Sequence, residues 1–165
     1  MFSFQNIALF LTILFSGLIA GLLYSYSCSV NIGLNVLPDQ QYLKAMQSIN
    51  RAIQNPYFFI CFMGLLLLFP IALWSFYQQH STVSLYLMLI AASLYFIGVF
   101  GITVFGNVPL NDKLDQFVIS SASKDEISAM RQAFEISWNK FHFIRTISAI
   151  LSFGLAILSL FKYRL

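Results

Sequence analysis

Four stretches of the chain, each long enough to cross a bilayer and nearly free of charge, constrain its fold more than any other feature. They cover residues 4–26, 57–77, 83–105 and 143–161. A membrane-spanning helix needs about 20 consecutive apolar residues. Only 9% of the residues are charged, whereas a soluble domain carries about 25%. The sequence therefore predicts an all-α membrane protein: a four-helix transmembrane bundle in a single domain, residues 1–165.

The first polar segment lies between the first two spans and is too polar to cross a bilayer. Its residues 31–39 have the composition of a loop, and Asp39 is placed to be the N-cap of the next helix. Residues 40–54 carry apolar side chains on one face and amides on another. Pro56 suits the first turn of the second span. We expect an amphipathic helix that caps one face of the bundle.

The second polar segment lies on the same face, because a short turn joins the second and third spans. Gly, Asn and Pro within residues 106–111 predict the end of the third span. Asn111 or Asp112 can then cap a short amphipathic helix. Ser123-x-x-Glu126 is a capping box that opens the last helix. This helix is expected to continue without a break into the fourth span.

The last helix carries polar residues at the depth where the chain should enter lipid. One narrow stripe at helical spacing contains Arg131, Glu135, Asn139, His142 and Thr146, with Arg145 at its edge. Phe134 is expected to point away from this stripe. Ionisable residues at membrane depth usually face a bundle interior or a wet cavity, so the stripe is a candidate site. In the alternative, Arg145 reaches the lipid headgroups and His142 only marks the interface.

Three polar segments should meet at one depth, because topology brings them to the same membrane face. These are residues 107–111, residues 139–146 and the helix that carries Gln47 and Asn50. Buried polar groups must satisfy one another, since an unpaired one costs about 1–3 kcal/mol. We therefore predict that Asn107 or Asn111 lies within hydrogen-bonding reach of the Asn139–His142–Arg145 group, directly or through one water.

Several other functions are poorly supported by the sequence. The charge of +3 is not clustered, so nucleic acid is not an expected partner. Cys28 and Cys61 form no CxxC pair and are expected to be two buried thiols, although a disulfide is geometrically possible. One His beside few carboxylates cannot supply three ligands to a catalytic metal, and no P-loop or dinucleotide motif is present.

Three segments together resemble the anthrone oxygenase-like family of small four-helix membrane proteins. They are residues 21–56 with Met46-Gln47 and Ile49-Asn50, Asn107-Val108-Pro109-Leu110-Asn111, and Trp138-Asn139 followed by His142 and Arg145-Thr146. The family takes its name from fungal members that oxidise anthrones to anthraquinones with oxygen and without metal or flavin. The resemblance implies a cofactor-independent oxygenase with molecular oxygen as co-substrate, although most members have no assigned function.

The residues fit such chemistry. His142, with a reference pKa near 6.5, is the expected base, assisted by the candidate catalytic residues Asn139 and Arg145. The candidate substrate-binding residues are Asn107, Asn111, Trp138, Gln47, Asn50 and Thr146. Trp138 can cover one face of a flat substrate.

A second hypothesis is a non-catalytic membrane module that binds a lipid, a quinone or a partner protein through Gln47, Asn50 and Gln54. The candidate partners are the lipid bilayer, a hydrophobic small molecule and a second copy of the chain. Gly17, Gly21 and Ser25 form a small-residue face, for which packing inside the bundle is favoured over dimerisation. We expect a multi-pass protein of a bacterial inner membrane, and the basic residues leave its orientation open.

Overall fold

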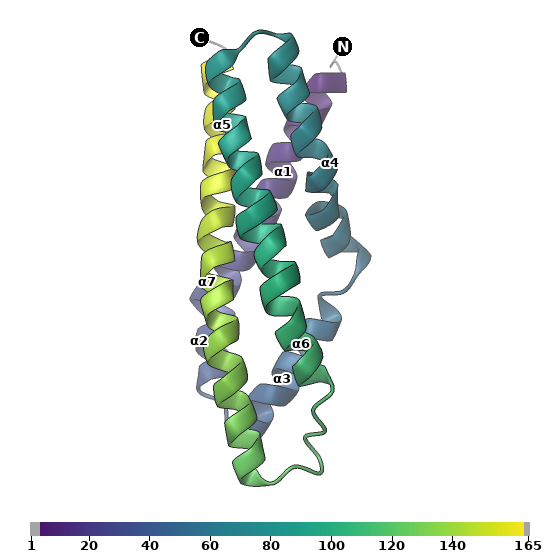
Figure 1. Cartoon of the computed structure of the whole chain (residues 1–165), viewed down its shortest axis with the longest axis vertical. Coiled ribbons are helices and arrows are strands. Elements are labelled where there is room, and N and C mark those ends of the chain that lie inside the picture. Colours follow the sequence, from purple (N-terminus) through teal and green to yellow (C-terminus); the bar gives the residue numbers. More distant parts are fainter. Residues whose placement is uncertain (1–3, 164–165) are drawn as a thin grey trace.

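The computed structural model describes residues 4–163, and their regular structure is entirely helical. Four helices are long and apolar enough to cross a membrane: Phe4–Asn35, Pro56–Gln78, Thr82–Asp115 and Lys124–Phe161. They run side by side along the long axis of the molecule (Figure 1). The predicted all-α bundle with four spans is therefore confirmed.

Two of these helices are composite, because they contain π-helical segments in which the backbone bonds to the fifth residue instead of the fourth. The first consists of α1 (Phe4–Ser25), η1 (Tyr26–Val30) and α2 (Asn31–Asn35). The third consists of α5 (Thr82–Ser93), η2 (Leu94–Gly101), η3 (Thr103–Asn107) and α6 (Val108–Asp115). The other helices are α3 (Asp39–Ala52), α4 (Pro56–Gln78) and α7 (Lys124–Tyr163).

The loop predicted over residues 31–39 is mostly wrong. The amide of Asn31 donates to the carbonyl of Tyr26, five residues earlier, so the helix continues through η1 into α2. It stops before Pro38, because a residue that precedes proline is disfavoured in helical geometry. Pro38 occupies the N-cap position of α3. Asp39 is therefore not the N-cap, and its carboxylate instead pairs with Arg131.

The helix end predicted at residues 106–111 is also wrong. The amide of Val108 donates to the carbonyl of Thr103 across the wider turn of η3. Pro109 follows in the first turn of α6, where its missing amide hydrogen costs little. The helix thus continues to Asp115, and Asn111 and Asp112 lie inside it instead of capping it.

The predicted helix starts of α4 and α7 are confirmed. The side chain of Asn55 accepts a hydrogen bond from the amide of Phe58 at 3.1 Å, and Pro56 occupies the first turn. The amide of Ser123 donates to Glu126 at 2.8 Å, while the amide of Glu126 donates back to the Ser123 hydroxyl at 3.3 Å. From this capping box α7 runs as one helix of 40 residues.

The interior is divided into two hydrophobic cores. The membrane core fills the half of the bundle in which α1 begins and α7 ends, and its largest buried members include Leu65, Phe69, Phe76, Met88 and Tyr95. The end core lies among α2, α3, α6 and the first half of α7, and includes Tyr42, Leu43, Met46, Leu114, Phe134 and Trp138. In Figure 1 these elements occupy the end opposite the chain termini. Phe134, which was expected to point away from the polar stripe, is 3% exposed and packs in the end core.

Candidate functional site

The predicted polar stripe of α7 meets η1 at the junction of the two cores. Trp138 belongs to the end core and Ala149 to the membrane core, and His142 lies between them with 2% of its surface exposed. Its side chain therefore faces the bundle interior. We call the residues that surround it the His142 cluster: Tyr26, Ser27, Trp138, His142, Arg145 and Thr146.

The hydrogen bonds of His142 fix its protonation state. The Arg145 guanidinium approaches Nδ1 with Nε at 3.3 Å and Nη2 at 3.2 Å. A guanidinium can only donate, so Nδ1 is the acceptor and carries no proton. Nε2 lies 2.8 Å from the Ser27 hydroxyl, which itself donates to the carbonyl of Leu23 at 3.1 Å. His142 is therefore neutral, with its hydrogen on Nε2 and its lone pair covered by Arg145.

Aromatic rings enclose the imidazole on two sides. The Trp138 ring stacks on His142 with centroids 4.9 Å apart and planes 18° apart. Tyr26 meets His142 edge-on at 5.0 Å and Trp138 at 5.2 Å. The Tyr26 hydroxyl donates to the sulfur of Met46 at 3.0 Å, which ties η1 to α3. The polar wall of the cluster is on the remaining side, where the Arg145 guanidinium faces His142 Nδ1.

Arg145 is a cation that pairs with none of the carboxylates among the described residues. Its guanidinium carbon lies 5.1 Å from the centre of the Trp138 ring, over the ring face. Within residues 4–163, the ion pairs involve Arg51 and Arg131. No described carboxylate lies within ion-pairing distance of Arg145, and a charge held inside a protein is normally paired.

Asn107 and Asn111 are bound to Trp138. The side-chain amide of Asn107 donates to the Trp138 carbonyl at 3.3 Å, and the indole N–H of Trp138 donates to the side chain of Asn111 at 2.9 Å. The Asn107–Asn111 segment therefore lies against the polar part of α7, as predicted. Its side-chain hydrogen bonds go to Trp138, however, and not to the side chains of Asn139, His142 and Arg145. The buried amide oxygens of Asn107 and Asn139 have no hydrogen-bond partner.

The remaining candidate residues have other positions. Thr146 donates to the carbonyl of His142 at 2.7 Å, and its oxygen lies 3.5 Å from Nε2, so it lines the cluster. The amide of Gln47 donates to the carbonyls of Leu114 and Phe117 at 2.8 and 3.1 Å. Gln47 thus fastens α3 to the end of α6. Asn50 is 8% exposed, and its amide nitrogen has no partner.

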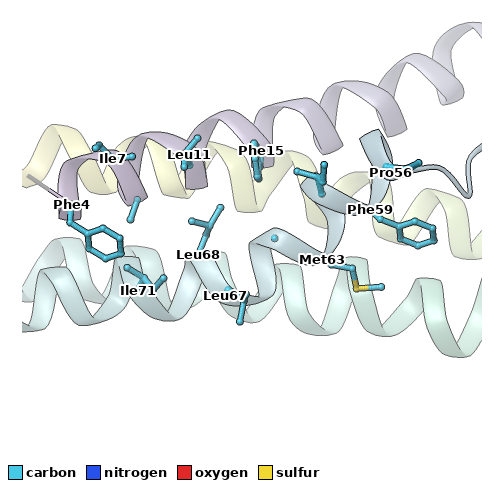
Figure 2. Close-up of a pocket in the computed structure, with 13 residues that line it drawn as sticks. Phe4, Ile7, Leu11, Phe15, Pro56, Phe59, Met63, Leu67, Leu68 and Ile71 are labelled. Atoms are coloured by element: carbon cyan, nitrogen blue, oxygen red, sulfur yellow. The ribbon is translucent and has the colours of Figure 1, made fainter. Parts of the chain in front are cut away.

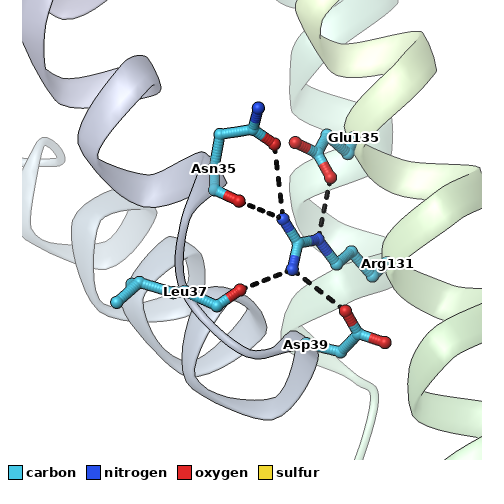
Figure 3. Close-up of polar contacts among 5 residues, drawn as sticks. All are labelled: Asn35, Leu37, Asp39, Arg131 and Glu135. Atoms are coloured by element: carbon cyan, nitrogen blue, oxygen red, sulfur yellow. Dashed lines mark hydrogen bonds and ion pairs between the residues drawn. The ribbon is translucent and has the colours of Figure 1, made fainter.

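Arg131 and Glu135, the first two residues of the predicted stripe, form a separate clamp in the end core. The Arg131 guanidinium donates to the carbonyls of Asn35 and Leu37 at 3.0 and 2.6 Å, to Asp39 at 2.9 Å and to Glu135 at 2.8 Å. Figure 3 shows Asn35, Leu37 and Asp39 approaching the guanidinium from the chain between the end of α2 and the start of α3, while Glu135 approaches it from α7. Arg131 therefore holds that segment against α7.

Tyr42 lies beneath this clamp. The guanidinium carbon of Arg131 is 4.5 Å from the centre of the Tyr42 ring. The Tyr42 hydroxyl is buried and has no hydrogen-bond partner. Burial, together with the nearby Glu135 carboxylate, raises the pKa of Tyr42 well above its usual value. Tyr42 stays neutral and acts as packing for the clamp.

Sequence reasoning missed Tyr26 and Ser27, which supply two walls of the cluster. Both lie in η1, where the chain still looks like the end of the first span. The only available signal was the polar run from Ser25 to Ser29 at the depth of His142. A π-helical turn changes which side chains face inward, and π-helical turns occur often at functional sites.

An apolar groove lies elsewhere, between α1 and α4. It has a volume of about 720 Å³ and an entirely apolar lining that includes Phe4, Phe15, Pro56, Met63 and Ile71. Figure 2 shows these side chains along the two helices. No residue of the His142 cluster lines it. The groove is an apolar lateral surface, and the His142 cluster is separate from it.

The cysteines and the other potential metal ligands are dispersed. Cys28 is exposed, Cys61 is half-buried, and both are free thiols. The expected burial of Cys28 is therefore wrong. Among residues 4–163, no three His, Cys, Asp or Glu side chains gather in an arrangement that could hold a metal ion.

A comparison with family models finds the anthrone oxygenase family over residues 58–155. The match includes the Asn107–Asn111 segment and the part of α7 that carries Trp138 to Thr146. The first resembling segment, residues 21–56, lies outside it, so Tyr26 and Ser27 are beyond the matched region. No curated protein and no solved structure matches the chain.

Proposed function

Because this chain belongs to the anthrone oxygenase family, we propose that it is a membrane-embedded oxygenase acting on a lipophilic aromatic substrate of the anthrone or phenolic kind. Molecular oxygen is the co-substrate, and no other cofactor takes part. The observation that carries the proposal is the buried, neutral imidazole of His142 beside Trp138 and Arg145. A base, a cation and an aromatic wall meet there.

The reaction needs little from the protein beyond these groups. An anthrone has an acidic methylene between two rings. Removal of one proton leaves a delocalised carbanion, which passes one electron to oxygen. The resulting carbon radical combines with the superoxide to give a peroxide anion. Protonation gives a hydroperoxide, and loss of one water leaves the quinone carbonyl. His142 takes the first proton, while Arg145 stabilises the oxyanion into which the carbanion delocalises.

Oxygen uptake by the protein in lipid nanodiscs tests this proposal, with dithranol or emodin anthrone as substrate. A general base contributes about 10²- to 10⁴-fold, so His142→Gln should lower the protein-dependent rate at least about 100-fold. His80→Asn is the matched control, because it removes the other histidine, at a turn where φ is 53° and Asn is tolerated. Equal uptake by His142→Gln and the parent protein would eliminate the oxygenase proposal.

The second candidate function is a non-catalytic module that binds a lipid or a quinone. It is favoured by the closure of the cluster, in which Arg145 covers the free lone pair of His142. Native mass spectrometry in mild detergent separates the two functions. A stoichiometric lipid or quinone that survives extraction, together with no oxygen uptake, supports the module.

A further inference from the structure

The Arg145 guanidinium donates to His142 Nδ1, so the lone pair of the proposed base is not free to accept a proton from a substrate. We propose that the ligand binds as a phenolate, whose oxyanion draws Arg145 off His142 Nδ1 and so frees the base. The inference rests on the proposed function and deepens it. It assigns the ligand a charge and makes His142 a proton acceptor only when the ligand is bound.

The first support is the missing counter-charge. In this cluster Arg145 touches a neutral imidazole and an indole face, and no described carboxylate pairs with it. A planar guanidinium binds oxyanions through paired, charge-assisted hydrogen bonds that are stronger than a bond to a neutral nitrogen. An oxyanion that enters the cluster should therefore displace Nδ1 as the acceptor.

The second support is the pair of unpartnered amide oxygens next to Trp138. Asn107 is 1% exposed, and its side-chain oxygen and that of Asn139 have no donor. Buried acceptors of this kind call for a hydroxyl or a water. A hydroxylated aromatic anion brings one oxyanion for Arg145 and further hydroxyl donors for the amides. A lipid phosphodiester group brings acceptors only, which favours the phenolate.

The proton transfer then follows from the hydrogen bonds already present. With Arg145 bound to the oxyanion, the Nδ1 lone pair takes the proton of the substrate C–H bond, and the electron pair remains on the carbon. Nε2 keeps its hydrogen, which still points at the Ser27 hydroxyl 2.8 Å away. The resulting imidazolium lies beside the anionic ligand. No other reactant is needed for this step, because oxygen enters afterwards.

Nitrogen NMR tests the inference without relying on activity. The chain has two histidines, so ¹⁵N-histidine labelling of the His80→Asn variant leaves the signals of His142 alone. In phosphatidylcholine nanodiscs without oxygen, we expect a proton on Nε2 and none on Nδ1. Addition of 1,8-dihydroxyanthraquinone at a pH where it is ionised should shift the Nδ1 resonance. Unsubstituted anthraquinone, which has no hydroxyl to ionise, should not.

Variants identify the group that responds. Arg145→Gln should lose the ligand-dependent shift and bind the dihydroxy compound at least about tenfold more weakly. Arg51→Gln is the matched control, because it removes the same charge from an exposed ion pair, and it should behave like the parent. If Arg145→Gln does not fold, the titration of the parent with the two anthraquinones still decides.

Several results would overturn the inference. They are a proton on Nδ1 in the ligand-free protein, equal responses to the two anthraquinones, and an unchanged response in Arg145→Gln. The same Nδ1 shift on replacing phosphatidylcholine by phosphatidylglycerol, without aromatic ligand, would assign the oxyanion to a lipid phosphate instead. Oxygen uptake that depends on His142, without any ligand-driven shift, would remove this inference and leave the proposed function standing.

Discussion

The membrane core and the end core hold their helices together by different means. In the membrane core, η2 and α7 approach so closely that a Cβ at Gly98 would lie 2.6 Å from that of Ser148. In the end core, polar side chains reach backbone carbonyls, as Arg131 and Gln47 do. Lipid tails are as apolar as leucine, so helices in a membrane associate largely by close packing, whereas irregular segments in water need polar anchors.

The largest expected effect comes from removing the clamp of the end core. Arg131→Ala should lower the free energy of unfolding by about 3 kcal/mol, because it leaves Asp39 and Glu135 without their cation. Hydrogen exchange should rise over residues 31–52 while α4 and α5 stay protected. Arg51→Ala breaks an exposed ion pair and should cost less than about 1 kcal/mol. Equal effects of the two variants would contradict the clamp.

Close packing in the membrane core should be the next most sensitive feature. Gly98→Ala should destabilise the protein by about 2 kcal/mol, because its Cβ would collide with the side chain of Ser148. Thermal unfolding in detergent measures the change. Gly21→Ala is the control, since a Cβ there meets nothing within 4 Å. Adding Ser148→Gly to Gly98→Ala should restore stability, and a double variant as unstable as the single one would argue against this contact.

The smallest effect is expected at Gln47, where two hydrogen bonds join α3 to the end of α6. Gln47→Leu should cost about 1 kcal/mol, the usual net value of such bonds, and should loosen residues 114–117 in hydrogen exchange. Gln41→Leu changes an exposed glutamine of the same helix and should leave both measurements unchanged. If the two substitutions behave alike, Gln47 is not an anchor.

The spans, the two helix starts and the unbroken α7 were predictable, because they depend on local hydropathy and on capping residues. The ends of the first and third helices were not. Asn, Gly and Pro near Asn31 and Pro109 are helix-breaking signals, yet η1 and η3 carry the helix past them. π-helical turns of this kind depend on packing against other helices, and the local sequence pattern carries no information about that packing.

The candidate site was predictable in part for the same reason. The helical period placed His142 and Thr146 on an inward face of α7, and both are buried. Their partners Tyr26 and Ser27 depend on the register of η1, so the pattern of the first span could not identify them. The burial of Phe134 could not be read from the stripe, because the end core is a second hydrophobic interior that α7 also contacts.

The unbroken α7 also determines the depth at which the His142 cluster lies. At about 1.5 Å per residue, its 40 residues reach about 60 Å, twice the hydrocarbon thickness of about 30 Å. When lipid surrounds the membrane core, the end core stands in water, and His142 lies near the level of the headgroups. Flat phenols collect in that layer with their hydroxyls hydrated and their rings among the acyl chains. The proposed phenolic ligand is therefore expected to occupy the cluster according to its amount per lipid, and not its concentration in the surrounding water.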